Sequence, residues 1–121
     1  MSRLYPSIGA SDVILFATPV YWYGPTALMK AFIDRFVYFN CPQNRPQVRG
    51  KRAAVALALE EETEATWRPV MDFFDKSLAY LEMTPAGTIV VPGVSEAGAI
   101  RQKQDRLDEA FRLGRTLAET T

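Results

Sequence analysis

Residues 11–39 constrain the fold of this chain more than any other stretch. The stretch begins with an uninterrupted apolar run at residues 13–17, which is typical of a parallel strand buried on both faces. An aromatic turn at residues 18–25 follows, and from Thr26 the apolar residues recur at helical spacing. Either Pro25 or Thr26 can open this helix. Its predicted inward stripe comprises Leu28, Met29, Phe32, Ile33, Phe36 and Val37. The turn therefore follows the carboxyl end of a buried strand, where open α/β sheets bind ligands.

Two further strands are expected in the remainder of the chain. With the first, they give a three-stranded parallel sheet formed by residues near 12–18, 52–59 and 87–91, since strands that alternate with helices form parallel sheets with right-handed crossovers. We expect the strand at 12–18 at one edge and the strand at 52–59 in the middle. Residues 84–87 are predicted to form a turn that leads into the third strand.

The helices follow from apolar spacing. Residues 65–83 carry apolar side chains at steps of three and four, and residues 1–11 form either a short helix or a disordered start. We expect the first two crossover helices on one sheet face and the closing helix, residues 99–119, on the other. The predicted inner face of the closing helix comprises Ile100, Leu107, Ala110, Phe111, Gly114 and Leu117. A glycine inside a helix costs about 1 kcal/mol relative to alanine, so close packing is the expected reason for Gly114.

At the aromatic turn the sequence resembles a known family. The string TPVYWYGPTALMKAFIDR is similar to the pattern SPVYW-x-x-x-x-A-x-x-K-x-F-I-D-R of flavodoxin-like NAD(P)H-dependent FMN reductases and quinone reductases. The matching positions are Thr18, Pro19, Val20, Tyr21, Trp22, Ala27, Lys30, Phe32, Ile33, Asp34 and Arg35. The end of the closing helix, with Phe111, Gly114, Leu117 and Ala118, also resembles this family. The resemblance covers nearly the whole chain.

The resemblance implies a fold and a cofactor. The fold is α/β, a flavodoxin-like three-layer sandwich, and the 121 residues supply strands three to five of it, so we predict a single partial domain, truncated at its N-terminus. In the family, the loop after the first of these strands surrounds the ring of FMN. The implied cofactor-binding residues are Thr18, Pro19, Val20, Tyr21, Trp22, Tyr23 and Gly24. The family's phosphate-binding loop, a Gly/Ser/Thr-rich turn at a helix N-terminus, belongs to the part that is missing.

Two functions are compatible with this pattern. The first is an FMN-dependent NAD(P)H oxidoreductase of the flavin or quinone reductase type, or the C-terminal part of one, which transfers electrons to a small-molecule acceptor. The second is a truncated flavin-free domain that acts as an oligomeric interaction module. Without the phosphate loop, we expect this chain alone to bind FMN weakly or not at all. No catalytic residue is identified.

Composition excludes several other functions. The chain has no histidine and one cysteine, Cys41, which excludes His-dependent catalysis, a zinc site and the iron–sulfur branch of the family. Fourteen basic residues balance fourteen acidic ones, so neither nucleic acid nor a membrane surface is an expected partner. The absence of an apolar signal core at the N-terminus predicts a cytoplasmic protein.

Three charged or apolar regions carry further expectations. The basic group Arg45, Arg49, Lys51 and Arg52 is either solvated or attracts a nucleotide phosphate. In the family that the chain resembles, the loop after the second strand is Gly-rich or small and lies against the flavin, so the acidic loop at residues 60–64 departs from that pattern. Carboxylates there would disfavour a reduced flavin, and we expect the loop instead to point to solvent near the next helix N-terminus. The strand at residues 12–18 presents an unpaired edge and the sheet beside it lacks a covering helix, so we predict a homodimer or a larger oligomer.

Overall fold

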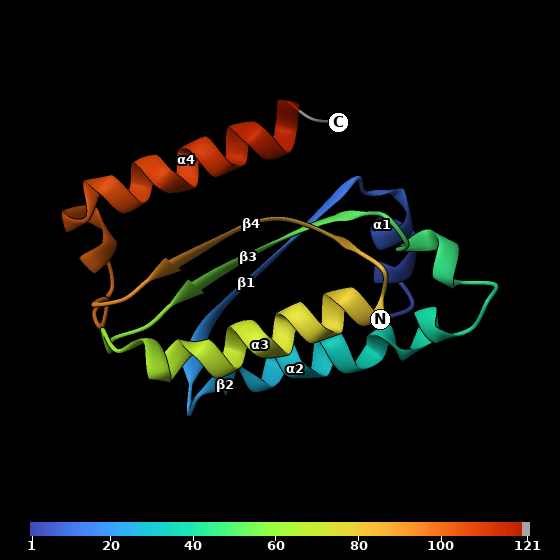
Figure 1. Ribbon diagram of the computed structural model, residues 1–121, viewed down its shortest axis with the longest axis horizontal. Helices are drawn as coiled ribbons and strands as arrows, with labels where there is room; N and C mark the ends of the chain where they lie inside the picture. The colour runs from blue at the N-terminus through green and yellow to red at the C-terminus, as the bar shows by residue number, and fades with distance from the viewer. Residues whose placement is uncertain (120–121) are drawn as a thin grey trace.

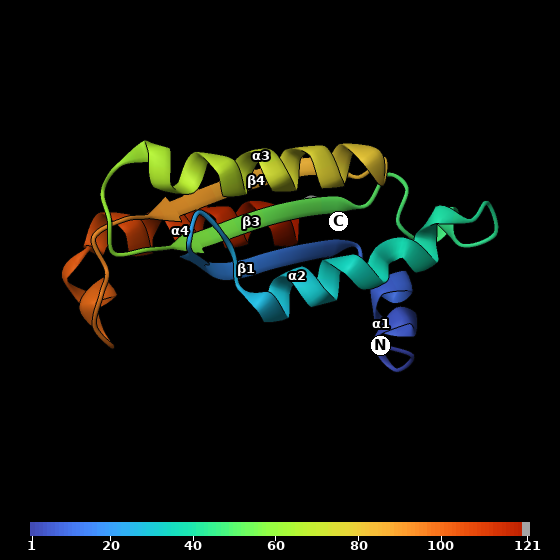
Figure 2. The same cartoon turned by 90° about the horizontal axis from the view of Figure 1, so that it is seen from below.

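The computed structural model describes residues 1–119 and contains one mixed sheet between two helical layers (Figures 1 and 2). The strands are β1 (Val13–Tyr21), β2 (Gly24–Pro25), β3 (Arg52–Ala58) and β4 (Thr84–Val91). The α-helices are α1 (Leu4–Ala10), α2 (Ala27–Asp34), α3 (Glu64–Tyr80) and α4 (Gln104–Glu119). Short 3₁₀ helices span Arg35–Asn40, Arg45–Gln47 and Ala99–Gln102.

The strand order is β2-β1-β3-β4, and β1, β3 and β4 run parallel. The predicted parallel arrangement of β1, β3 and β4, with β3 between the other two, is confirmed. The sheet has a fourth strand, because β2 pairs with the end of β1, so β1 is an edge strand only before Val20. The helices α2 and α3 cover one face and α4 lies over the other (Figure 2). This is the three-layer arrangement of a flavodoxin-like α/β fold.

Two strand boundaries differ from the predictions. The strand β1 continues through Tyr21 instead of ending near Thr18, because Pro19 still pairs with β3 and Val20 and Tyr21 pair antiparallel with β2. The predicted turn at 84–87 is wrong, since β4 begins at Thr84. Its register against β3 shifts by one residue between Ala53 and Ala54, which leaves an extra residue in β4. A proline and a glycine in this segment made it resemble a turn in the sequence.

The main core lies between the sheet and the helices α2 and α3. Phe16 of β1 is 1% exposed and packs against Phe32, Phe36 and Phe74 with ring centroids 6.3, 6.1 and 5.7 Å apart. The predicted inward stripe on α3 is confirmed by its buried residues Val70, Met71, Phe74 and Leu78.

The predicted stripe on α2 is wrong in two places. Leu28 is 85% exposed and Val37 is also exposed. The α-helix ends at Asp34 and continues as a 3₁₀ helix from Arg35, which has three residues per turn. The tighter winding rotates the side chains that follow, so that Phe36 and Phe39 are buried and Val37 is not.

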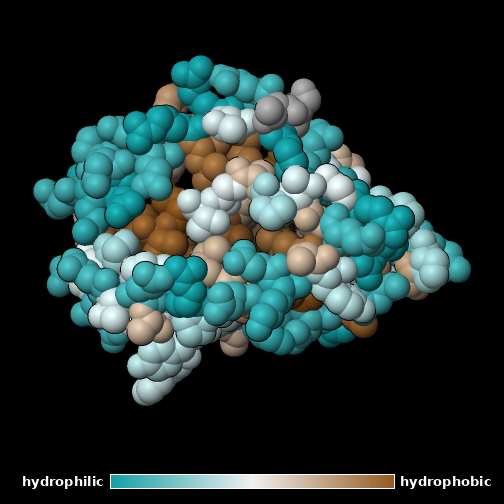
Figure 3. All heavy atoms as spheres, in the orientation of Figure 1, coloured by the Kyte–Doolittle hydropathy of each residue, from teal (hydrophilic) through white to brown (hydrophobic). Residues whose placement is uncertain are grey.

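The opposite face of the sheet is only partly covered. The helix α4 lies along β4, and a cavity of about 460 Å³ opens between α4 and the carboxyl half of β1 and β3. Brown, hydrophobic residues are visible in the hollows of this face in Figure 3. Leu15 of β1 and Phe111 of α4 are both exposed, and Phe111 is 68% accessible to solvent. The predicted inward position of Phe111 is therefore wrong in this chain.

The contact that seats α4 on the sheet involves Gly87, which the sequence pattern did not indicate. Gly87 has φ +147°, and a Cβ atom there would lie 2.4 Å from Cδ1 of Leu113. By contrast, a Cβ atom at Gly114 meets nothing within 4 Å among the described residues. The close packing expected at Gly114 is absent, and the close approach of α4 occurs at Gly87.

These two glycines give a matched pair of alanine substitutions. Gly87→Ala is expected to lower the free energy of unfolding by about 1–3 kcal/mol, because it combines an unfavourable φ with a clash against Leu113. Gly114→Ala is expected to raise it by roughly 1 kcal/mol, because alanine favours a helix interior. Urea denaturation of both variants measures the difference. A loss at Gly114 instead would mean that a second surface packs against that side of α4.

Candidate functional site

The aromatic segment at the end of β1 forms a tight hairpin. Val20 pairs with Pro25 and Tyr21 with Gly24, which leaves Trp22 and Tyr23 as the two turn residues. Their φ angles are +49° and +61°. Positive φ at both central positions identifies a type I′ turn, a position that normally carries Asn-Gly. Two bulky aromatic residues therefore occupy a backbone conformation that costs each about 1–2 kcal/mol.

Two threonines anchor the base of this hairpin. Thr18 is buried, and its Oγ1 accepts a hydrogen bond of 3.2 Å from the backbone N–H of Thr26. The Oγ1 of Thr26 in turn accepts a hydrogen bond of 3.2 Å from the N–H of Met29, which caps α2 as predicted. The hairpin is thus connected at its base to the N-terminus of a helix.

The hairpin side chains point away from the core. Trp22 is 94% exposed, and Tyr21 and Tyr23 are more than half exposed. Exposed aromatic side chains on a strained turn contribute little to folding, so folding alone does not account for them. Strained and exposed aromatic residues at the carboxyl end of a parallel strand favour a ligand-binding role.

Two cavities lie beside the hairpin, where the carboxyl ends of the three parallel strands meet. The first, about 270 Å³, is lined by Val20, Trp22, Tyr23, Leu59, Glu60, Glu61 and Thr66. The second, about 340 Å³, is lined by Pro19, Val20, Tyr21, Ala58, Leu59, Glu60, Val94 and Ser95. Backbone hydrogen bonds hold the rim together, since Val94 donates to the carbonyl of Leu59 at 2.9 Å and Gly93 to that of Glu60 at 3.1 Å.

Five of the seven predicted cofactor-binding residues, from Pro19 to Tyr23, line these two cavities. Thr18 lies below them and lines the neighbouring apolar cavity instead. Gly24 pairs with Tyr21 in the hairpin, so it belongs to the hairpin and not to the lining of the two cavities.

Residues from the loops after β3 and β4, and one residue of α3, complete the rim, and none of them is among the predicted cofactor-binding residues. They are Leu59, Glu60, Glu61, Thr66, Val94 and Ser95. The signal for them was topological, because loops that follow adjacent parallel strands share one edge of the sheet.

The electrostatic character of the rim is acidic. Glu60 and Glu61 are exposed but line the cavity beside Trp22, and the hydroxyl of Thr66 donates to Oε2 of Glu61 at 2.6 Å. The prediction that this loop points to solvent is therefore only partly correct, because Glu60 and Glu61 also line the cavity. Among the described residues, none that lines either cavity is a lysine or an arginine.

The last acidic residue of this stretch, Glu64, lines neither cavity and forms an ion pair with Arg68. Its hydrogen bond and its charge raise the pKa of Arg68.

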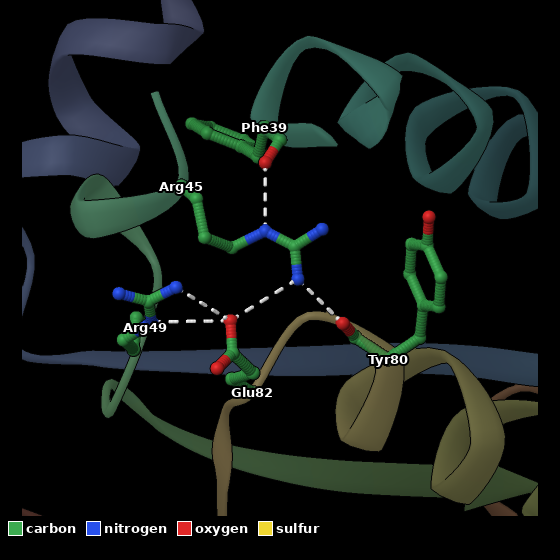
Figure 4. Close-up of polar contacts among 5 residues, drawn as sticks. All are labelled: Phe39, Arg45, Arg49, Tyr80 and Glu82. Carbon is green, nitrogen blue, oxygen red and sulfur yellow. Dashed lines mark hydrogen bonds and ion pairs between the residues drawn. The ribbon is translucent and has the colours of Figure 1, made fainter. Parts of the chain in front are cut away.

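The basic residues that were predicted either to be solvated or to attract a nucleotide phosphate lie at the opposite end of the strands from the hairpin. As Figure 4 shows, Arg45 donates to the carbonyls of Phe39 (2.9 Å) and Tyr80 (2.5 Å), and Arg49 donates to Glu82 at 3.0 and 3.1 Å. Glu82 precedes β4 with φ +59°. The Lys51 ammonium donates to the carbonyl of Gly9 at 2.9 Å, and Arg52 donates to that of Leu117 at 2.7 Å. These four cations hold chain segments together far from the hairpin.

Metal chemistry and membrane insertion receive no support from the described residues. Within residues 1–119, no group of three or more histidine, cysteine, aspartate or glutamate side chains is placed to hold a metal ion. The helices of this same part of the chain are too short or too polar to cross a bilayer. The rim of the hairpin remains the candidate site.

The hairpin allows a test in which stability and binding change in opposite directions. Replacing the turn with its preferred residues, Trp22→Asn with Tyr23→Gly, is expected to raise the free energy of unfolding by about 1–2 kcal/mol, since both residues tolerate positive φ. The same double variant removes both aromatic side chains from the rim. Thermal and urea denaturation measure the gain. A destabilised double variant would show that the two rings pack against the fold and are not strained.

Comparison with known proteins agrees with this architecture. The family model described as a flavodoxin-like fold matches residues 7–112. A Bacillus subtilis relative, YwqN, whose name describes an NAD(P)H-dependent FMN-containing oxidoreductase, is 27% identical over 105 residues, which are 84% of this chain and 58% of that protein. An iron-sulfur flavoprotein from Archaeoglobus fulgidus is 29% identical over 121 residues, 98% of this chain and 50% of that protein. The chain thus spans about half the length of these two relatives.

Solved structures show the same fold. The Trp repressor binding protein from Bacillus subtilis superposes with a TM-score of 0.84 at 24% identity, covering 93% of this chain and 68% of that one. The general stress protein 14 from Treponema denticola, solved in complex with FMN, gives a TM-score of 0.74 at 16% identity, covering 95% and 72%. These structures share the fold, and the match of the family model over most of the chain shows that the chain belongs to the flavodoxin-like fold family.

Proposed function

We propose that this chain is, or forms part of, an FMN-dependent NAD(P)H oxidoreductase of the flavin or quinone reductase type. The observation that carries the proposal is the strained, exposed Trp22–Tyr23 turn at the carboxyl edge of a parallel sheet, beside two cavities. The name of the YwqN relative supports the cofactor and the reductant. Bound FMN would carry electrons from NAD(P)H to a small-molecule acceptor, and the protein would orient and shield it.

The residues present fit the ring of this cofactor and not its phosphate. Trp22 and Tyr23 offer aromatic surfaces, and Val20 and Leu59 add apolar lining. A phosphate needs backbone N–H groups or cations, and among the described residues that line the two cavities the charged ones are Glu60 and Glu61. The proposal therefore assigns ring contact to the hairpin and leaves the phosphate without a partner in the described rim.

Aromatic substitutions test the proposal. With FMN in excess and a quinone as acceptor, Trp22→Ala and Tyr23→Ala are expected to lower the rate of NAD(P)H oxidation at least about tenfold, since base–aromatic stacking is worth roughly 1–3 kcal/mol per ring in related contexts. The matched control is Tyr80→Ala, because Tyr80 is also exposed but lies at the far end of α3. Equal losses in all three variants would contradict the proposed role of the hairpin, and no activity in the unmodified chain would contradict an activity of this chain by itself.

We also propose that the chain assembles as a homodimer or a larger oligomer. Among the described strands, none pairs with the outer edge of β1 before Val20, and Leu15 and Phe111 leave apolar surface uncovered on the face beside α4. Soluble proteins normally cover such edges and patches.

Static light scattering at micromolar concentration is expected to give at least twice the mass of 13.6 kDa. Phe111→Ser is expected to shift this distribution toward the monomer. A monodisperse monomer of the unmodified chain would contradict the assembly proposal without bearing on the hairpin.

A further inference from the structure

We propose that the rim of the hairpin selects planar aromatic ligands that lack a phosphate, so that this chain binds riboflavin more tightly than FMN. The inference rests on the proposed function, because it uses the same cavity. It adds a preference for riboflavin over FMN, although the name of the YwqN relative contains FMN.

The attractive part of the site is apolar and aromatic. Trp22 and Tyr23 are separated from Leu59 by a cavity of about 270 Å³, and Val20 forms part of the same lining. The second cavity shares Val20 and Leu59 with the first, and its lining also includes Tyr21 and Val94. Uncharged aromatic rings gain by stacking and by burial of apolar area in such a site.

The repulsive part of the site is a pair of acidic residues, of which Glu60 is held through its main chain and Glu61 through its carboxylate. The carbonyl of Glu60 accepts a hydrogen bond of 3.1 Å from Gly93, and the carboxylate of Glu61 accepts one of 2.6 Å from Thr66. Both residues line the cavity beside the aromatic turn. A phosphate on a ligand seated there meets two like charges at short range, which lowers affinity by roughly threefold to tenfold for each exposed carboxylate.

The cations nearest to this rim do not offset that repulsion. Arg106 lines the neighbouring apolar cavity and is ion-paired with Glu109 at 2.8 Å. Lys103 lies at Gly93 beside a further carboxylate, since a Cβ atom on Gly93 would lie 3.0 Å from Nζ of Lys103 and 2.7 Å from Oε1 of Glu62. Arg45 and Arg49 contact Glu82 (Figure 4), which precedes β4 and so lies at the other end of the strands from the hairpin.

The test compares riboflavin with FMN by isothermal titration of the 121-residue chain at low salt. The unmodified chain is expected to bind riboflavin at least about fivefold more tightly than FMN. The double variant Glu60→Gln with Glu61→Gln is expected to tighten FMN binding about tenfold and to leave riboflavin binding within twofold. The matched control, Asp72→Asn with Asp75→Asn, makes the same change in net charge on the exposed side of α3 and is expected to change neither ligand.

Each result decides between the two proposals. Tighter binding of FMN than of riboflavin by the unmodified chain would overturn the ligand preference and leave the flavin site standing. An unchanged ratio in the Glu60–Glu61 double variant would overturn the role of the carboxylates. A loss of FMN affinity in Arg106→Gln would show that this arginine holds the phosphate, which also overturns the preference. Binding of neither ligand would overturn the flavin site itself.

Discussion

Replacing Phe16 by alanine is expected to lower the free energy of unfolding by about 3–5 kcal/mol. Phe16 is 1% exposed and its ring lies within 5.7 to 6.3 Å, centroid to centroid, of three other phenylalanine rings. Its removal leaves a cavity between β1 and both covering helices, which a small sheet cannot close by relaxation. Since domains of this size unfold at about 5–15 kcal/mol, the variant is expected to lose much of its stability.

Leu15 provides the control for this prediction, because it is the preceding residue of β1 and points to the opposite, open face. Leu15 is 54% exposed, so Leu15→Ala is expected to cost less than about 1 kcal/mol. Urea denaturation followed by tryptophan fluorescence measures both variants. Equal losses at the two positions would show that a partner covers the open face or that Phe16 is not central to the core.

Replacing Arg45 by alanine is expected to cost about 2–3 kcal/mol, the second largest loss. Its side chain is 13% exposed and its guanidinium donates to two main-chain carbonyls, those of Phe39 and Tyr80, and contacts Glu82 at 3.4 Å. Truncation leaves both carbonyls without this donor. Arg45→Lys is expected to recover only part of the loss, because an ammonium group cannot reproduce the planar fork.

Arg49→Ala is the control that distinguishes the loss of main-chain hydrogen bonds at Arg45 from the loss of an ion pair. The side chain of Arg49 is 57% exposed and its contact is an ion pair with Glu82, so Arg49→Ala is expected to cost at most about 1 kcal/mol. Denaturation curves at low and high salt distinguish the two, since salt screens the Arg49 pair and not the Arg45 hydrogen bonds. A loss at Arg49 as large as that at Arg45 would contradict this division of roles.

The order of the parallel strands was predictable because it depends on patterns that few other folds produce. The apolar run at residues 13–17 and the alanine-rich strand β3 predicted two buried parallel strands, and the helical spacing between them requires a crossover. The prediction of burial on both faces is wrong for β1, because Leu15 and Ala17 are exposed. The positions of Leu28, Val37 and Phe111 were less accessible to prediction. Each of the three residues belongs to a stretch with helical spacing. Whether its side chain is buried depends on the local winding of the helix or on whether another surface covers it.

Sequence patterns predicted only part of the conformation of the site. The sequence indicated that aromatic residues follow β1, but Trp-Tyr lacks the Asn-Gly signal of a type I′ turn, so the hairpin was not expected. The contact between Gly87 and Leu113 joins two distant elements, and periodicity does not reveal such a pair. The carboxylates of Glu60 and Glu61 were noticed as a departure from the family, and the fold brings them to the same cavity as Trp22.

The central claim is that the hairpin and its rim hold a flavin ring, and backbone NMR titration of the chain with riboflavin and with FMN tests it most directly. The account predicts shifts concentrated in residues 19–24, 58–61 and 93–95, larger with riboflavin at equal concentration. It also predicts that the chemical shifts of amides near Arg45 and Glu82, at the other end of the strands, remain unchanged. Shifts centred on that end, or on the groove lined by residues within 33–40 and 76–81, with residues 19–24 unaffected, would contradict the account.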